Sequence, residues 1–427
     1  MPNLETKPRF VPARRDQLEL VPRDLESLIP SDHEARGIWN FVEKVDLSAF
    51  YAPIKAVEGE AGRPATDPKV LLALELYSLS KGIGSAREVV RQTECHDAYR
   101  WIRGGVPLNH HTLSDFRIEH REALDKLLTQ SIAVLMNVGA IALERVAQDG
   151  TKVRASAGRS SFRRGKTLER CLIEAQEQLA WVKREAERGE QPVTAREQAS
   201  RERAARERAE RVDEALRQLP EIEKRRDKQK TKGKKKLGEA RASTTDPDAR
   251  VMKMGNGGYA PGFNFQFATD SKEGCIVGVT CTNSPADSHQ LSPMLADILR
   301  RCGKLPTDYL VDAGYTSAEN IDAAEVGRIV VYGPVLTGNR KTDIDPFAPR
   351  LGDSPAMVDF RLRMGSAEGK TAYRDRAQLA ELTNAVVKER FGVRSLSVRG
   401  LEKATCIALW AALTFNVMKM VSQGLLL

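Results

Sequence analysis

The stretch YRDRAQLAELTNAVVK, residues 373–388, lies in a predicted helix near the end of the chain. It combines a phenol at Tyr373, cations at Arg376 and Lys388, and one carboxylate at Glu381. A basic and aromatic face around a single acid suits a bent phosphate backbone. A solvated, charged helix has the same residue types, so the surrounding sequence must decide between the two interpretations.

The region before this helix has the pattern of α/β structure, in which short apolar runs alternate with amphipathic segments. An earlier strand candidate within 142–153 runs into Asp149 and Gly150, and residues 334–370 have a loop-like composition. The apolar run 404–418 is too short to span a bilayer and predicts a buried core helix. The other expected elements are strands at 263–268, 275–281, 308–312 and 328–332, and helices at 290–302, 317–324, 373–390 and 401–423.

The first third of the chain is predicted to be helical. Residues 1–60 form a Pro-containing arm that passes into short helices. Asp67 before Pro68 is typical of a helix start, and Ser85 with Glu88 forms a capping box that opens a second helix. A third element ends at 99–103, and a long amphipathic helix is expected from Thr112 to about Met136. The pattern of residues 62–138 therefore predicts a compact helical domain that is rich in arginine.

Residues 163–245 have a different composition. Apolar residues recur at spacings of four and three, which is a heptad stripe, and a second capping box at Thr194 and Glu197 opens a charged helix to about Leu219. Two such helices predict an antiparallel hairpin, although the stripe could also pair with another copy. After Pro220 comes a basic tract that is expected to be disordered without a partner. The stripe is Leu168, Leu172, Ala175, Leu179 and Val182, and the tract is Lys224, Arg225, Arg226, Lys228, Lys230, Lys232, Lys234, Lys235 and Lys236.

The bulk properties favour a nucleic-acid partner. The chain of 427 residues carries a net charge of +9, and such a basic surplus attracts polyanions. Its six cysteines form no C-x-x-C pair, so neither a zinc ribbon nor a disulfide framework is expected, and a reducing cytoplasm fits. The N-terminus has no apolar segment of the secretory type.

Three acids form the candidate catalytic set. Two divalent cations about 4 Å apart can activate the attacking and stabilise the leaving oxygen of a scissile phosphate, and Mg²⁺ prefers carboxylate ligands. Asp149 and Asp312 stand near the ends of strand candidates, and Glu381 lies on the later helix. An Asp at a strand end is often only a turn residue. Glu389 is a rival third acid, and Asp287 is a rival ligand whose simpler role is to cap the helix at 290.

Taken together, these motifs resemble the insertion-sequence DDE transposases, whose signature is Y-x2-R-x3-E-x6-K. The resemblance covers most of the chain outside about 163–250, and it includes the N-terminal helices that begin at Gly62. Four residues separate Arg376 from Glu381 where the signature has three, whereas Glu381 to Lys388 keeps the expected six. The resembling blocks are 148–152, 258–270, 311–315, 373–388 and 399–416.

The resemblance implies a fold of four parts. These are an N-terminal arm with short helices at 1–61, a helical DNA-binding domain at 62–140, an RNase H-like α/β catalytic core at 141–162 and 251–427, and a helical-hairpin insertion with a basic tail at 163–250. Relatives carry their insertion between the second Asp and the Glu, whereas here it follows the first Asp. A DNA hairpin intermediate is therefore not assumed.

The resemblance also implies the chemistry. Asp149, Asp312 and Glu381 would bind two Mg²⁺ ions, for which Mn²⁺ could substitute, and Tyr373, Arg376 and Lys388 would hold DNA. The reaction would be hydrolytic nicking at the element's end, followed by attack of the freed 3′ hydroxyl on target DNA. The partners would be double-stranded DNA, as terminal inverted repeats and target, and a second copy in the DNA complex. No membrane partner is expected, and the location would be the bacterial cytoplasm, on the nucleoid when bound to DNA.

Further DNA contacts are expected from the N-terminal arginines, although a solvated helix surface would explain each of them equally simply. For the basic tract DNA contact is favoured over the alternative, a solubilising linker. Two other functions remain open: a nuclease with the same core but no strand transfer, and a domesticated DNA-binding protein whose acids are vestigial. The residues concerned are Arg87, Arg91, Arg100, Arg103 and Arg117, with Lys234, Lys235 and Lys236 of the tract.

Overall fold

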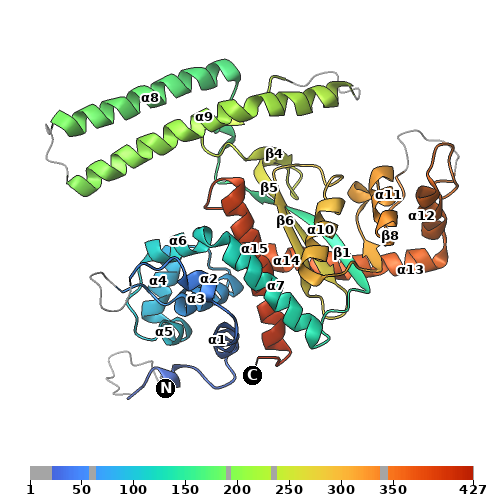
Figure 1. Cartoon of the computed structure of the whole chain (residues 1–427), viewed down its shortest axis with the longest axis horizontal. Helices are drawn as coiled ribbons and strands as arrows, with labels where there is room; N and C mark the ends of the chain where they lie inside the picture. Colours follow the sequence, from blue (N-terminus) through green and yellow to red (C-terminus); the bar gives the residue numbers. More distant parts are fainter. Residues whose placement is uncertain (1–21, 57–63, 189–193, 232–237, 337–344, 427) are drawn as a thin grey trace, which may run out of the picture.

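The computed structural model describes residues 22–56, 64–188, 194–231, 238–336 and 345–426. Figure 1 shows N-terminal helices on one side, a mixed sheet with its flanking helices on the other, and a long two-helix hairpin that extends above both. The sheet and the N-terminal helices share one large hydrophobic core.

The N-terminal region is all-helical, as expected. The side chain of Asp67 accepts the backbone N–H of Lys69, which confirms the predicted helix start. The single helix predicted over 112–136 is wrong, because the backbone at His120 (φ −107°, ψ 38°) divides it into α6 and α7. The elements are η1 (Glu26–Leu28), α1 (Glu34–Lys44), α2 (Ser48–Tyr51), α3 (Pro68–Ser80), α4 (Ala86–Cys95), α5 (Asp97–Arg103), α6 (His110–Glu119) and α7 (Arg121–Asn137).

The main sheet has the order β4-β5-β1-β7-β8, and β6 pairs with β5. β5 runs antiparallel to β1, whereas β7 runs parallel to it, with Val146 opposite Tyr309. Because parallel neighbours end at the same edge, the chain that leaves β7 comes close to the middle of the longer β1. The strands are β1 (Arg145–Arg154), β4 (Arg250–Lys253), β5 (Tyr259–Asp270), β6 (Ile276–Thr282), β7 (Asp308–Leu310) and β8 (Val330–Tyr332).

Two expectations about this region need correction. Asp149 lies in the middle of β1 rather than near its end, because β1 continues to Arg154 in register with β5. The segment predicted as loop-like contains α12 (Pro355–Gly365), which starts at the capping side chain of Ser354 and buries Phe360. The glycines and prolines of this segment flank the helix and conceal it in the sequence pattern.

One helix organises the core. The predicted buried helix is α15 (Leu401–Ser422), which packs against α7, β6 and α3. Among the described residues it alone is long and apolar enough to cross a membrane, yet 72% of its apolar window is buried inside the protein. The remaining helices are α10 (Leu291–Cys302), η3 (Ala313–Tyr315), α11 (Ala318–Val326), α13 (Ala367–Arg376), η4 (Ala377–Glu381), α14 (Leu382–Ala385) and η5 (Val386–Arg390), of which η4 and η5 are π-helical.

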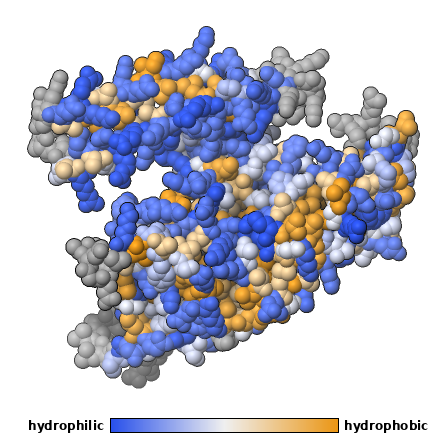
Figure 2. All heavy atoms as spheres, in the orientation of Figure 1, coloured by the Kyte–Doolittle hydropathy of each residue, from blue (hydrophilic) through white to orange (hydrophobic). Residues whose placement is uncertain are grey.

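The hairpin consists of α8 (Gly165–Arg188) and α9 (Ala195–Thr231), which pack along their lengths. The heptad stripe faces inward, since Leu168, Ala175 and Val182 are buried. The outer surface is mostly hydrophilic (Figure 2). A small sheet of β2 (Phe162–Arg163) and β3 (Ala242–Ser243) closes the base of the hairpin. The short helix η2 (Arg159–Ser161) precedes β2, and the side chain of its Arg159 is exposed.

The helix break predicted at Pro220 is wrong. α9 continues through Pro220 to Thr231, because neighbouring Leu219 and Ile222 pack on the small core at the hairpin base. Part of the basic tract is therefore helical rather than disordered. Residues 232–237, which include Lys234, Lys235 and Lys236, lie outside the described residues.

Candidate active site

Asp149 is held by contacts from β1 itself and from the helix that crosses it. Its Oδ1 accepts the N–H of Gly150 at 2.8 Å, and its Oδ2 accepts Nδ2 of Asn384 at 3.0 Å. Nη2 of Arg376 lies 3.3 Å from the same Oδ2. Burial raises the pKa of Asp149, although Arg376 opposes this rise. The carboxylate is therefore in a partly desolvated position that a cation would stabilise.

Asp312 stands two residues beyond β7 and caps the short helix η3, with its Oδ1 accepting the N–H of Ala313 at 2.8 Å. Its side chain is 54% exposed, and its Oδ2 is 4.0 Å from Nη2 of Arg376. One guanidinium group thus lies between the carboxylates of Asp149 and Asp312. The structure brings these two predicted acids together across 163 positions of sequence.

Three of the predicted DNA-binding residues also face this site. Arg376 lies beside the Tyr373 phenol, whose pKa is raised by burial, although the charge of Arg376 opposes this rise. Burial lowers the pKa of Lys388, whereas the charge of Asp149 acts to raise it. Tyr373, Arg376 and Lys388 therefore form one face of the helix next to the paired aspartates.

Glu381 does not join the two aspartates in this structure. Its side chain is exposed and has no hydrogen bond or ion pair within the described part of the chain. Among the described residues, no group of three Asp, Glu, His or Cys side chains is close enough to hold a metal ion. The sequence expectation that three acids converge is thus met for two of them.

The extra residue between Arg376 and Glu381 has a structural counterpart. Residues 377–381 form the π-helical turn η4, which holds one more residue than an α-helical turn. Glu381 consequently follows Arg376 by one full turn, as it would with the three-residue spacing in an α-helix.

Sequence reasoning missed Asn384, the helix residue that hydrogen-bonds Asp149. Its Nδ2 donates to that carboxylate, and its buried Oδ1 has no hydrogen-bond partner among the described residues. A signal was present, since Asn384 is a polar residue three helical turns after Tyr373. With two carboxylates and an unpartnered amide oxygen, the donor set fits a hard divalent cation.

The two rival acids have other partners. Glu389 pairs with Arg394 at the surface. The cap predicted for Asp287 is wrong, because Gln290 is the N-cap of α10 and the Asp287 side chain bonds elsewhere. Its Oδ1 accepts Nζ of Lys152 at 2.8 Å.

Most of the N-terminal arginines proposed for DNA have acidic partners. Arg100 pairs with Asp97, and Arg103 with Glu94. The side chain of Arg117 is 11% exposed and pairs with buried Glu75, which is a structural role. Arg91 pairs with Glu88, one turn earlier in the same helix. Arg87 is exposed and has no ion pair within the described part of the chain, so it is the freest of these candidates.

Two family models match the chain. A transposase DDE domain matches residues 227–417, and a transposase domain of the DUF772 type matches residues 23–119. Curated proteins and solved structures gave no match. An RNase H-like α/β core with paired aspartates defines an enzyme of metal-dependent phosphoryl transfer. The chain belongs to the insertion-sequence DDE transposases and has a DNA transposase function.

The DDE match contains Asp312 and Glu381 but begins after Asp149 and most of the hairpin. The evidence that Asp149 belongs to the same site is therefore structural: β1 pairs with β7, and the guanidinium of Arg376 lies close to both aspartates.

Proposed function

We propose that the protein cuts one DNA strand at each end of its element and joins the freed 3′ hydroxyl to target DNA, with Asp149, Asp312 and Glu381 as the catalytic acids. The observation that supports this most is the meeting of Asp149 and Asp312 around Arg376. Two Mg²⁺ ions, or Mn²⁺ in their place, would activate the attacking oxygen and stabilise the leaving oxygen.

The residues of this chain would bind the cations and hold the DNA. Asp149 and Asp312 would hold the cations, and the exposed Glu381 would complete the ligand set from the rim of the site. Arg376 lies where its positive charge would repel an incoming cation, so we expect its guanidinium to turn toward a DNA phosphate when cations and DNA bind. Tyr373 and Lys388 would then contact the same strand.

The wider assembly follows from the same proposal. Arg87, with the weaker candidates Arg100 and Arg103, would contact the terminal repeat, and Lys234, Lys235 and Lys236 would neutralise phosphates without reading sequence. Two copies would bridge the two ends of the element in the bacterial cytoplasm, at the nucleoid.

The test uses purified protein and a DNA duplex that carries the element's terminal repeat. We expect Asp149→Asn and Asp312→Asn each to lower Mg²⁺-dependent cleavage at least 1,000-fold, on the scale of a lost metal ligand. DNA binding in EDTA should remain within about threefold of wild type. Asp359→Asn, which changes an exposed acid on α12, is the matched control and should cut normally.

The result that contradicts the site is unchanged cleavage by both variants. A pre-cut end with a 3′ hydroxyl separates the possible activities, because a transposase joins it to a target plasmid and a nuclease does not. Glu381→Gln should behave as the two Asp variants do, and full activity would assign the third ligand elsewhere.

A further inference from the structure

Asp287 lies at the centre of a polar network that the catalytic proposal does not use. It stands in the loop between β6 and α10, and three donors converge on its Oδ1. These are Nζ of Lys152 at 2.8 Å, Nδ2 of Asn264 at 2.7 Å and Nε2 of Gln266 at 2.8 Å. No such donor reaches its Oδ2 within the described part of the chain. The carboxylate is thus anchored by one oxygen only.

The anchor is rigid because the side chains around it are buried and hydrogen-bonded to one another. Gln266 accepts the Tyr315 hydroxyl at 2.5 Å and Nε2 of Gln148 at 2.9 Å. Gln148 in turn accepts the Tyr309 hydroxyl at 2.8 Å. Gln148, Gln266 and Tyr309 are completely buried. Each donor and acceptor fixes its neighbour, so the position of the Asp287 carboxylate is set by the sheet.

Asp287 also lies next to both segments that present the paired aspartates, which are the middle of β1 and the turn after β7. A side chain at Gly150, next to Asp149, would place its Cβ 2.7 Å from Oδ1 of Asp287. A Cβ at Gly314, two residues after Asp312, would lie 3.5 Å from Cβ of Asp287. The Asp287 side chain therefore lies between the two segments, and together with Gln266 and Asn264 it leaves residue 150 no room for a side chain.

We infer that Asp287 is a positioning residue of the cation site: it spaces the strand that carries Asp149 from the turn that follows Asp312, and its negative charge strengthens cation binding between the two aspartates. This inference rests on the proposed function. The ion-pair partner of Asp287 is Lys152, whose side chain is 15% exposed.

The test measures cation binding without DNA, as the rise in melting temperature during a Mn²⁺ titration. Asp287→Asn keeps the shape and removes the charge. We expect it to raise the half-maximal Mn²⁺ concentration about tenfold, on the scale of one partly screened charge. DNA binding in EDTA should not change. Lys152→Met leaves the Asp287 charge uncompensated, so this variant should lower the half-maximal Mn²⁺ concentration.

The outcomes are distinguishable. If Asp149→Asn still shows the wild-type Mn²⁺ response, the proposed metal site itself is wrong. If Asp149→Asn abolishes the response but Asp287→Asn titrates as wild type does, only the inference about Asp287 is overturned. A structural role alone would lower the melting temperature without Mn²⁺ and leave the half-maximal concentration unchanged. Should Asp287→Asn fail to fold, a Lys152→Met titration that is not shifted to lower Mn²⁺ would overturn the inference.

Discussion

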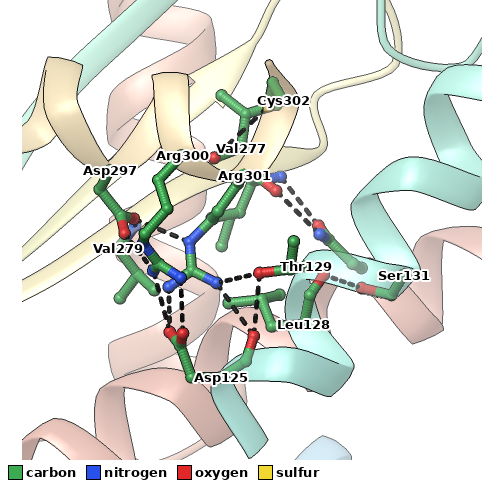
Figure 3. A network of polar contacts seen from close by, with 12 residues as sticks. Asp125, Leu128, Thr129, Ser131, Val277, Val279, Asp297, Arg300, Arg301 and Cys302 are labelled. Carbon is green, nitrogen blue, oxygen red and sulfur yellow. Dashed lines mark hydrogen bonds and ion pairs between the residues drawn. The ribbon is translucent and has the colours of Figure 1, made fainter. Parts of the chain in front are cut away.

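Two adjacent arginines on α10 provide a sharp stability test, because they share acidic partners and differ in burial. Figure 3 shows Arg300 and Arg301 between Asp297 of their own helix and Asp125 of α7. The Arg301 side chain is 1% exposed, whereas that of Arg300 is 51% exposed. The network ties the N-terminal helices to the catalytic sheet, since Asp297 also accepts the N–H of Val279 in β6 at 2.9 Å.

We expect Arg301→Met to destabilise this junction by about 3 kcal/mol. Removing one partner of a buried pair costs about 3–5 kcal/mol. The lower end applies because Arg300 still bonds Asp125 at 2.7 Å and Asp297 at 2.6 Å. Arg300→Met keeps the buried pair and removes an exposed one, for which about 1 kcal/mol or less is expected.

Native-state hydrogen exchange of amides in α7 and β6 measures the difference. About 2 kcal/mol between the variants corresponds to roughly 30-fold faster exchange in Arg301→Met. Burial acts to raise the pKa of Asp125, but the two arginines outweigh it and hold that pKa below its usual value. The contribution of this network to the free energy of unfolding should therefore be present at neutral pH and be lost as pH falls below about 4. Equal exchange rates in the two variants would refute the burial argument.

Other positions give further expected outcomes. Burial raises the pKa of Asp246 to about 6, so stability should fall as pH rises from about 4 to 6; Asp246→Asn should flatten that part of a melting-temperature profile. Leu168→Ala should destabilise the hairpin base by about 2–5 kcal/mol, because Leu168 is completely buried in its small core, and proteolysis should then cut α8 first. Gly150→Ala should abolish cleavage while DNA binding in EDTA persists, because its Cβ would meet the side chains of Gln266, Asp287 and Asn264.

Local patterns in the sequence predicted the elements well wherever one face is buried. The strands at β5, β6 and β8 and the helices α10 and α15 lie close to their predicted ranges, because apolar periodicity follows burial directly. The patterns failed where a local signal was overridden by packing. Pro220 remains helical because its neighbours pack on the hairpin core, and α12 forms within a segment of glycines and prolines.

The candidate site was predictable in part. Asp149 and Asp312 could be chosen because each is an acid that follows or interrupts an apolar run, and parallel pairing then brings them together. The helical spacing of Asn384 from Tyr373 was not enough to assign its role, because its bond to Asp149 depends on where the helix crosses β1. Asp287 was assigned to a helix cap, since the cross-strand neighbours that hold its carboxylate are far away in sequence.

The π-helical turn at 377–381 leads to a last prediction. It tests whether cleavage depends on the helical register of the residues that follow the turn, and not on the presence of the extra residue itself. If this turn absorbs one extra residue, deletion of exposed Gln378 should convert it to an α-helical turn and leave every later side chain in place. Deletion of exposed Lys370, in the α-helical part of the same helix, should instead rotate residues 371–390 by about 100° and break the bond from Asn384 to Asp149. We therefore expect near-normal cleavage and melting temperature after the first deletion and loss of cleavage after the second. Equal loss in both would show that the turn is needed for more than accommodating the extra residue.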